Sequence, residues 1–88
     1  MQSVWKQVEK VEMLIEHISK HDTVYYKAPL NTRPVRCRVV RYTVDHRKPG
    51  ASCITIKGPD GTRFDRLRLA EHLDRFWWKT DVPDEPGR

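Results

Sequence analysis

Cys37 and His46 are the residue types that make a thiol nucleophile and its general base. The run Val35-Arg-Cys-Arg-Val39 alternates apolar and basic residues, which is typical of a strand with one buried side. This alternation places Cys37 with the apolar set, where a thiol is buried and inert. The pair therefore predicts a structural cysteine and no catalytic site.

His17 and His21 are one helical turn apart, a spacing that could place two imidazoles on one metal ion. No third ligand follows in a matching pattern, so exposed histidines at a helix end are the simpler interpretation. His72 lies near Asp74 in the sequence, but no serine follows at a spacing that would complete a catalytic site. The glycines of residues 58–61 belong to a hairpin turn rather than to a phosphate-binding loop. We therefore expect no enzymatic activity, no metal and no cofactor.

Positive charge is concentrated in the middle of the chain. Residues 1–22 carry three basic against four acidic side chains, residues 23–69 carry eleven against three, and residues 70–88 carry three against five. The formal net charge of +5 thus combines a basic body of +8 with mildly acidic ends. Such a body favours polyanions, most commonly nucleic acid, although arginines on a solvated sheet face also maintain solubility and block edge pairing.

The basic residues of the predicted sheet, with one outward-facing tyrosine, form the candidate nucleic-acid site. Guanidinium groups hold phosphates through paired hydrogen bonds, and an aromatic ring between them can stack on a base. No helix-turn-helix, zinc finger or RNA-recognition aromatic pair is present, so we expect contacts to shape and backbone rather than to sequence. The predicted contacts are Arg36, Arg38, Arg41, Arg47, Lys48, Arg63 and Tyr25.

Part-way along the strand that positions these arginines, the apolar residues change from odd-numbered to even-numbered positions. Val35, Cys37 and Val39 share one side, but the apolar set then becomes Val40, Tyr42 and Val44. One extra residue at Val39-Val40, a β-bulge, would keep both sets on one side and bend the strand. A second parity change between Phe64 and Leu67 indicates another irregularity or the end of a strand.

Apolar spacing predicts a helix at each end of the chain. Residues 3–20 contain no Gly or Pro, repeat their apolar residues every three or four positions, and have Ser3 as a candidate N-cap. Residues 69–79 return to helical spacing and leave Trp78 at the exposed side. Residues 81–88 are rich in proline and acid and are expected to form a disordered tail. Residues 1–80 then make a single domain.

The predicted fold is α+β, with a strongly bent, barrel-like sheet of four antiparallel strands in residues 22–67 between the two helices. The segments Asp22-Thr-Val-Tyr-Tyr26, Val35 to Val44 and Ile54-Thr-Ile-Lys-Gly-Pro-Asp-Gly-Thr-Arg-Phe64 carry a resemblance in pattern to the small barrel of Src-homology-three-like, Tudor and KOW modules. That resemblance covers about half of the chain and implies binding to nucleic acids or peptides through loop aromatic and basic side chains.

A protein-interaction or adaptor domain, present as a monomer or a homodimer, is the alternative function. Trp5 and Trp78 would anchor it, since aromatics at the edge of an amphipathic helix face are common interface residues. No segment has the roughly 20 apolar residues of a membrane span, and no signal pattern opens the chain. We therefore expect a cytoplasmic protein with reduced Cys37 and Cys53, present as a monomer or homodimer. The predicted partner is DNA, RNA or an acidic protein surface, since all three present negative charge.

Overall fold

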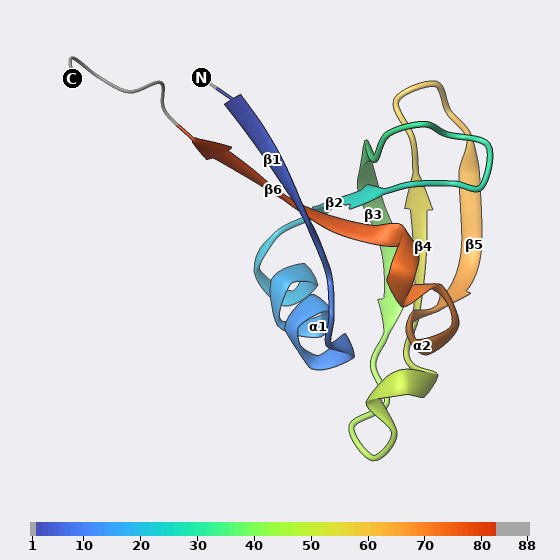
Figure 1. The fold of residues 1–88 in the computed structure, drawn as a ribbon. Coiled ribbons are helices and arrows are strands. Elements are labelled where there is room, and N and C mark those ends of the chain that lie inside the picture. The colour runs from blue at the N-terminus through green and yellow to red at the C-terminus, as the bar shows by residue number, and fades with distance from the viewer. Residues whose placement is uncertain (1, 83–88) are drawn as a thin grey trace.

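A computed structural model describes residues 2–82 of the 88-residue chain, and it contains one six-stranded sheet with two helices (Figure 1). The elements follow one another in chain order: β1 (Gln2–Gln7), α1 (Val11–Lys20), β2 (Thr23–Tyr26), β3 (Val35–Thr43), a 3-10 turn (Pro49–Ala51), β4 (Cys53–Lys57), β5 (Arg63–Arg68), α2 (Leu69–His72), a second 3-10 turn (Leu73–Arg75) and β6 (Phe76–Val82).

The sheet is antiparallel throughout and has the strand order β1-β6-β2-β3-β4-β5. Strands β2 to β5 form a meander, as the sequence predicts. Strand β6 returns from the far end of the chain and lies between β1 and β2, so the two ends of the chain complete the sheet (Figure 1). The prediction of four strands in a barrel-like sheet was therefore wrong: the sheet has six strands and is not closed into a barrel.

The predicted helix over residues 3–20 was wrong in its first half, because residues 2–7 form β1. The helix begins only at Val11, after an extended Lys10 with φ −128° and ψ 133°. The predicted N-cap Ser3 pairs instead with Asp81 across β1 and β6. Pairing with β6 gives the β1 backbone hydrogen-bond partners that a helix would have supplied, so a distant segment outweighs the local periodicity.

The predicted helix over residues 69–79 was also largely wrong. The helix α2 has only four residues and is followed by a 3-10 turn, and strand β6 begins at Phe76. The segment Phe76-Trp-Trp-Lys-Thr-Asp-Val82 is rich in aromatic and β-branched residues, which favour strands. Asp81 and Val82, expected in the tail, belong to β6. The remainder of that tail, residues 83–88, lies outside the described residues.

The predicted β-bulge in the central strand is confirmed. Val39 pairs with Ile56, whereas Arg41 pairs with the next residue of β4, Thr55, so Val40 is the extra residue. The bulge returns Tyr42 to the side of Ile54, but Val40 and Tyr42 stay 46% and 45% exposed. The apolar set after the bulge is thus only half covered.

The three-residue spacing of the apolar residues Phe64 and Leu67 in β5 corresponds to a second β-bulge. Ile54 pairs with Leu67 and Ile56 with Phe64, so two residues of β5 lie opposite the single residue Thr55. Arg66 takes a left-handed conformation there (φ 51°), and its N–H donates to the hydroxyl of Thr55 at 3.2 Å. The bulge allows both Phe64 and Leu67 to point toward the core.

The core occupies one side of the sheet, which we call the inner face. Both helices pack on this face, since Leu14 and Ile18 of α1 and Leu69 of α2 join the same buried cluster as the strand residues. The strand members of that cluster are Val24, Tyr26, Cys37, Ile54, Ile56, Leu67 and Phe76. Among the described residues, no helix is long and apolar enough to cross a membrane.

Candidate nucleic-acid interface

The opposite side of the sheet, the outer face, carries a continuous row of aromatic and basic side chains. Directly opposed residues of antiparallel strands share a face, so the strand register identifies the members. Across β1, β6 and β2, Trp5 opposes Lys79 and Tyr25 opposes Trp77. Across β2 to β5, the outer face presents Tyr25 opposite Arg36, Arg38 opposite Lys57, and Lys57 opposite Arg63.

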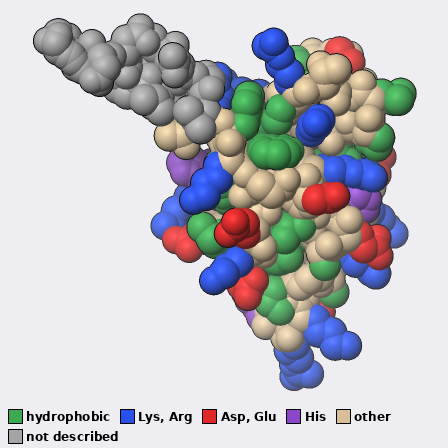
Figure 2. All heavy atoms as spheres, viewed as in Figure 1, with side chains coloured by type: hydrophobic (Ala, Val, Ile, Leu, Met, Phe, Trp, Pro, Cys, Tyr) green, Lys and Arg blue, Asp and Glu red, His purple; other side chains and the backbone are tan. Residues whose placement is uncertain are grey.

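Three aromatic side chains gather at the β1-β6-β2 end of the outer face. Trp5 and Tyr25 meet edge to face, with ring centroids 5.2 Å apart. The Lys79 ammonium nitrogen lies 6.0 Å from the centroid of Trp5 and 5.9 Å from that of Tyr25, within the range of cation–π attraction. All three rings are partly exposed. Figure 2 shows hydrophobic side chains at the surface over this part of the sheet, with Lys and Arg around them.

The β3-β4-β5 end of the outer face is cationic. Arg36, Arg38 and Lys57 are exposed and have no ion-pair partner within the described part of the chain. Arg63 lies 3.3 Å from an oxygen of Asp65, an exposed contact that neutralises little of its charge. Like charges directly opposite each other on a sheet destabilise it, so the Arg38-Lys57-Arg63 row costs folding free energy.

Arg41 joins the same face because of the β3 bulge. It pairs with Thr55, whose neighbours Ile54 and Ile56 point inward, so Arg41 points outward with Arg38. Without the extra residue, the alternation of β3 would turn Arg41 to the inner face. Arg41 and Arg63 line a shallow concavity of about 440 Å³ on this face together with Arg66. Five of the seven predicted contacts therefore share one surface: Tyr25, Arg36, Arg38, Arg41 and Arg63.

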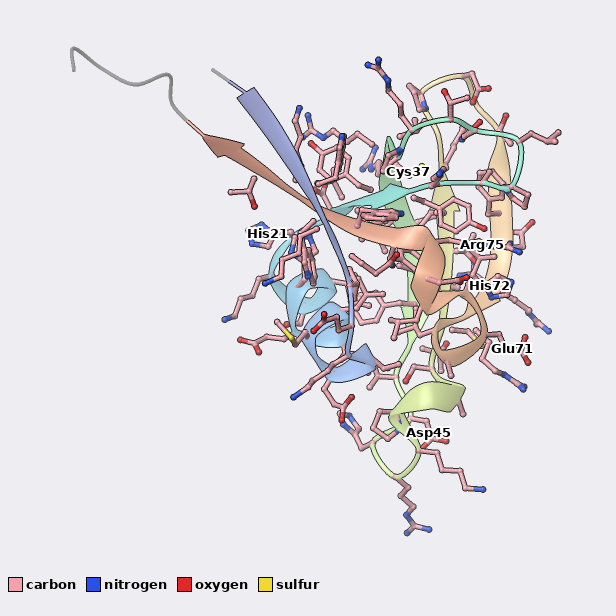
Figure 3. All side chains as sticks on the ribbon, viewed as in Figure 1. His21, Cys37, Asp45, Glu71, His72 and Arg75 are labelled. Atoms are coloured by element: carbon pink, nitrogen blue, oxygen red, sulfur yellow. The ribbon has the colours of Figure 1, made fainter. Side chains whose placement is uncertain are left out.

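Arg47 and Lys48 are not part of this surface. They follow Asp45 in the loop after β3, and the backbone N–H groups of both residues donate to the Asp45 carboxylate at 2.9 Å. Figure 3 places Asp45 at the opposite end of β3 from Cys37, which neighbours Arg36 and Arg38. The structure therefore separates these two predicted contacts from the other five.

Trp77, Lys79 and Lys57 belong to the outer face and were missed by the sequence prediction. Trp77 and Lys79 were assigned to a helix, which hid their alternation with the inward-facing Phe76 and Trp78. The Trp77 indole Nε1–H is buried and has no hydrogen-bond partner among the described residues. Reading residues 76–82 as a strand, from their aromatic and β-branched content, would have placed Trp77 and Lys79 together on the side of the strand opposite to Phe76 and Trp78.

The two predicted interface tryptophans lie on opposite faces of the sheet. Both are on strands rather than helices. Trp5 is on the outer face, while Trp78 opposes Lys6, packs against the buried cluster and lies 5.1 Å from His17 between ring centroids. The expectation that Trp78 is the more exposed residue of a helix was therefore wrong, and the two side chains cannot form one contact surface.

Cys37 is buried on the inner face, as the alternation predicts. Burial raises the pKa of its thiol, and the negative charge of Asp60 raises it further, so little thiolate forms at neutral pH. Cys53 opposes Thr43, six residues along β3 from Cys37, and points to the outer face. The two thiols are free and too far apart to form a disulfide bond.

The histidines form no metal site within residues 2–82. The rings of His17 and His21 are stacked with centroids 4.6 Å apart, and the His17 Nε2 lies 2.9 Å from the Thr23 carbonyl oxygen. His72, on α2, hydrogen-bonds the Arg68 carbonyl oxygen at 3.0 Å through its Nδ1 (Figure 3). No group of three or more metal-ligating side chains occurs in the described chain.

Comparison with protein-family models, with curated proteins and with solved structures finds no match for this chain. The resemblance of residues 22–67 to Src-homology-three-like, Tudor and KOW modules therefore stays a prediction. The outer face is defined by the geometry of this chain alone.

Proposed function

We propose that this protein is a small, non-enzymatic binding module that contacts nucleic acid through the outer face of its sheet. The observation that carries the proposal is the row Arg38-Lys57-Arg63, in which three cations oppose one another on neighbouring strands. Such a row weakens the free protein. An anionic ligand that neutralises it would recover that free energy on binding.

The rest of the outer face supports nucleic acid over other anions. Arg36 and Arg38 alternate along β3 on the same side, about 7 Å apart at two residues of strand rise. Guanidinium groups form paired hydrogen bonds with phosphate oxygens, and Tyr25 lies directly opposite Arg36. An aromatic ring beside a row of guanidinium groups suits a ligand that has both bases and phosphates.

A non-enzymatic role is supported by the environment of Cys37, whose raised pKa makes it a poor nucleophile. We also propose a cytoplasmic location, which two free thiols favour. The alternative of a protein-interaction domain depended on Trp5 and Trp78 on helix faces. Because both lie on strands and on opposite faces, we propose the nucleic-acid function alone.

Fluorescence anisotropy with labelled single- and double-stranded oligonucleotides at low salt tests the proposal. Replacing Arg36, Arg38 and Arg41 with Glu should abolish binding, while circular dichroism shows an intact fold. Replacing Arg47 and Lys48 with Glu changes the charge in the same direction at the other end of β3, and should leave most of the affinity. Equal losses in the two variants, or no binding by the unaltered protein, would overturn the proposal.

A further inference from the structure

We infer that the ligand of the outer face is a single strand, whose bases stack on Trp5, Tyr25 and Trp77 while its phosphates follow the arginines of β3. This inference rests on the proposed function and specifies its ligand. It arises from the position of the three aromatic residues, which lie on consecutive strands beside the cationic row.

The sugar-phosphate backbone and the bases of a bound strand would contact different parts of the outer face. Arg36, Arg38 and Arg41 lie along β3 on the outer face and form the phosphate track. Tyr25 is one strand spacing from Arg36, about 5 Å, and Trp77 is two spacings away, about 10 Å. Bases that project from a backbone on β3 therefore extend over β2 and β6, where the rings lie.

A duplex does not use this arrangement. In a double helix the faces of the bases are stacked on one another, and a protein meets only their edges and the phosphates. Aromatic rings such as Tyr25 and Trp77 would then lie against a charged backbone and lose water without gaining a stacking partner. Unpaired bases expose their aromatic faces, and all four bases have such a face. The three rings of Trp5, Tyr25 and Trp77, which we call the ring cluster, therefore favour single strands without strong sequence preference.

A lysine also places a positive charge beside the ring cluster. Lys79 lies about equally far from the centroids of Trp5 and Tyr25, at 6.0 and 5.9 Å. Its ammonium group therefore places a positive charge at the base-binding end of the face, distant from the arginines of β3. This charge adds to the attraction of the face for an anionic strand, although it lies away from the phosphate track on β3.

An abasic oligonucleotide tests the inference without altering the protein. A thymine single strand of about eight nucleotides, within the range of site sizes for such surfaces, is compared with an abasic strand of equal length and charge. We expect the abasic strand and a duplex of equal length each to bind about tenfold more weakly or worse. Equal affinity for the thymine and abasic strands would overturn the inference and leave the proposed function intact. No binding to any of the three would overturn both.

Paired variants locate the stacking surface. Trp77→Leu should weaken binding of the thymine strand about tenfold, while affinity for the abasic strand stays the same. Trp77→Phe retains an aromatic ring and removes the unpartnered Nε1–H, so it should keep most of the affinity. Trp78→Leu is the matched control, since Trp78 opposes Lys6 and lies on the inner face. An equal loss in a folded Trp78→Leu protein, or no difference between the two Trp77 variants when both are folded, would contradict the assignment.

Discussion

Removing Arg36 and Arg38 should lower the salt dependence of nucleic-acid binding by a predictable amount. Each phosphate neutralised on a single strand contributes about −0.7 to the slope of log affinity against log salt. The β3-β4-β5 end of the outer face, where the phosphates are expected, offers four cations without a described ion-pair partner: Arg36, Arg38, Arg41 and Lys57. If each binds one phosphate, the slope is about −2.8, and the Arg36→Gln/Arg38→Gln variant halves it to about −1.4.

These slopes correspond to measurable changes in affinity. Between about 50 and 200 mM salt, the unaltered protein should lose about 50-fold in affinity and the double variant only about sevenfold. Anisotropy titrations at several salt concentrations give both slopes. The Arg47→Gln/Lys48→Gln variant removes the same charge from the loop after β3 and should keep the original slope. The reasoning is refuted if the two double variants have equal slopes.

Three further predictions concern stability and thiol reactivity. Gly61→Ala should destabilise the protein by about 1 kcal/mol in urea unfolding, because Gly61 has φ +91° in the β4–β5 turn; an unchanged midpoint would contradict that strain. Arg38→Thr should stabilise the free protein by about 0.2–1 kcal/mol, since it relieves repulsion with Lys57, and a lower melting temperature would count against the like-charge row. Iodoacetamide should modify Cys53 well before Cys37, which is buried with a raised pKa, as mass spectrometry of peptides can show; equal rates would disprove this difference.

The central strands could be predicted from the sequence because their signals are local. Alternation identified β3, and the parity change at Val39-Val40 identified its bulge. The turn sequence Gly58-Pro-Asp-Gly61 identified the β4–β5 hairpin. These features depend on residues that are close together in the chain.

The two terminal strands could not be predicted in the same way. The spacing of Val4, Val8 and Val11 continues into the true helix without a break, so periodicity alone gave one long helix. The decisive interaction is the pairing of β1 with β6, for example Trp5 with Lys79, which are more than 70 residues apart. The sequence of residues 2–7 alone does not predict this pairing, because the strand propensity of a segment depends on what that segment packs against.

The candidate site was therefore predicted in most of its cationic half, where only Lys57 was missed, whereas Tyr25 was the one aromatic residue of the ring cluster that was predicted as a nucleic-acid contact. The arginines of β3 follow from local alternation. The ring cluster requires knowing that β6 lies between β1 and β2, which places Trp77 beside Tyr25. The same topology removes Trp78 from the surface by turning it to the inner face.

The tryptophan indole N–H signals in a ¹H–¹⁵N NMR titration provide the most direct test of the outer face. The chain has three tryptophans, with Trp5 and Trp77 on the outer face and Trp78 on the inner face, so the protein contains its own control. On addition of a single-stranded oligonucleotide at low salt, the signals of Trp5 and Trp77 should shift together with the amides of β2 and β3, while Trp78 stays in place. Shifts confined to Trp78 and α1 would show that the ligand binds elsewhere and would contradict the account.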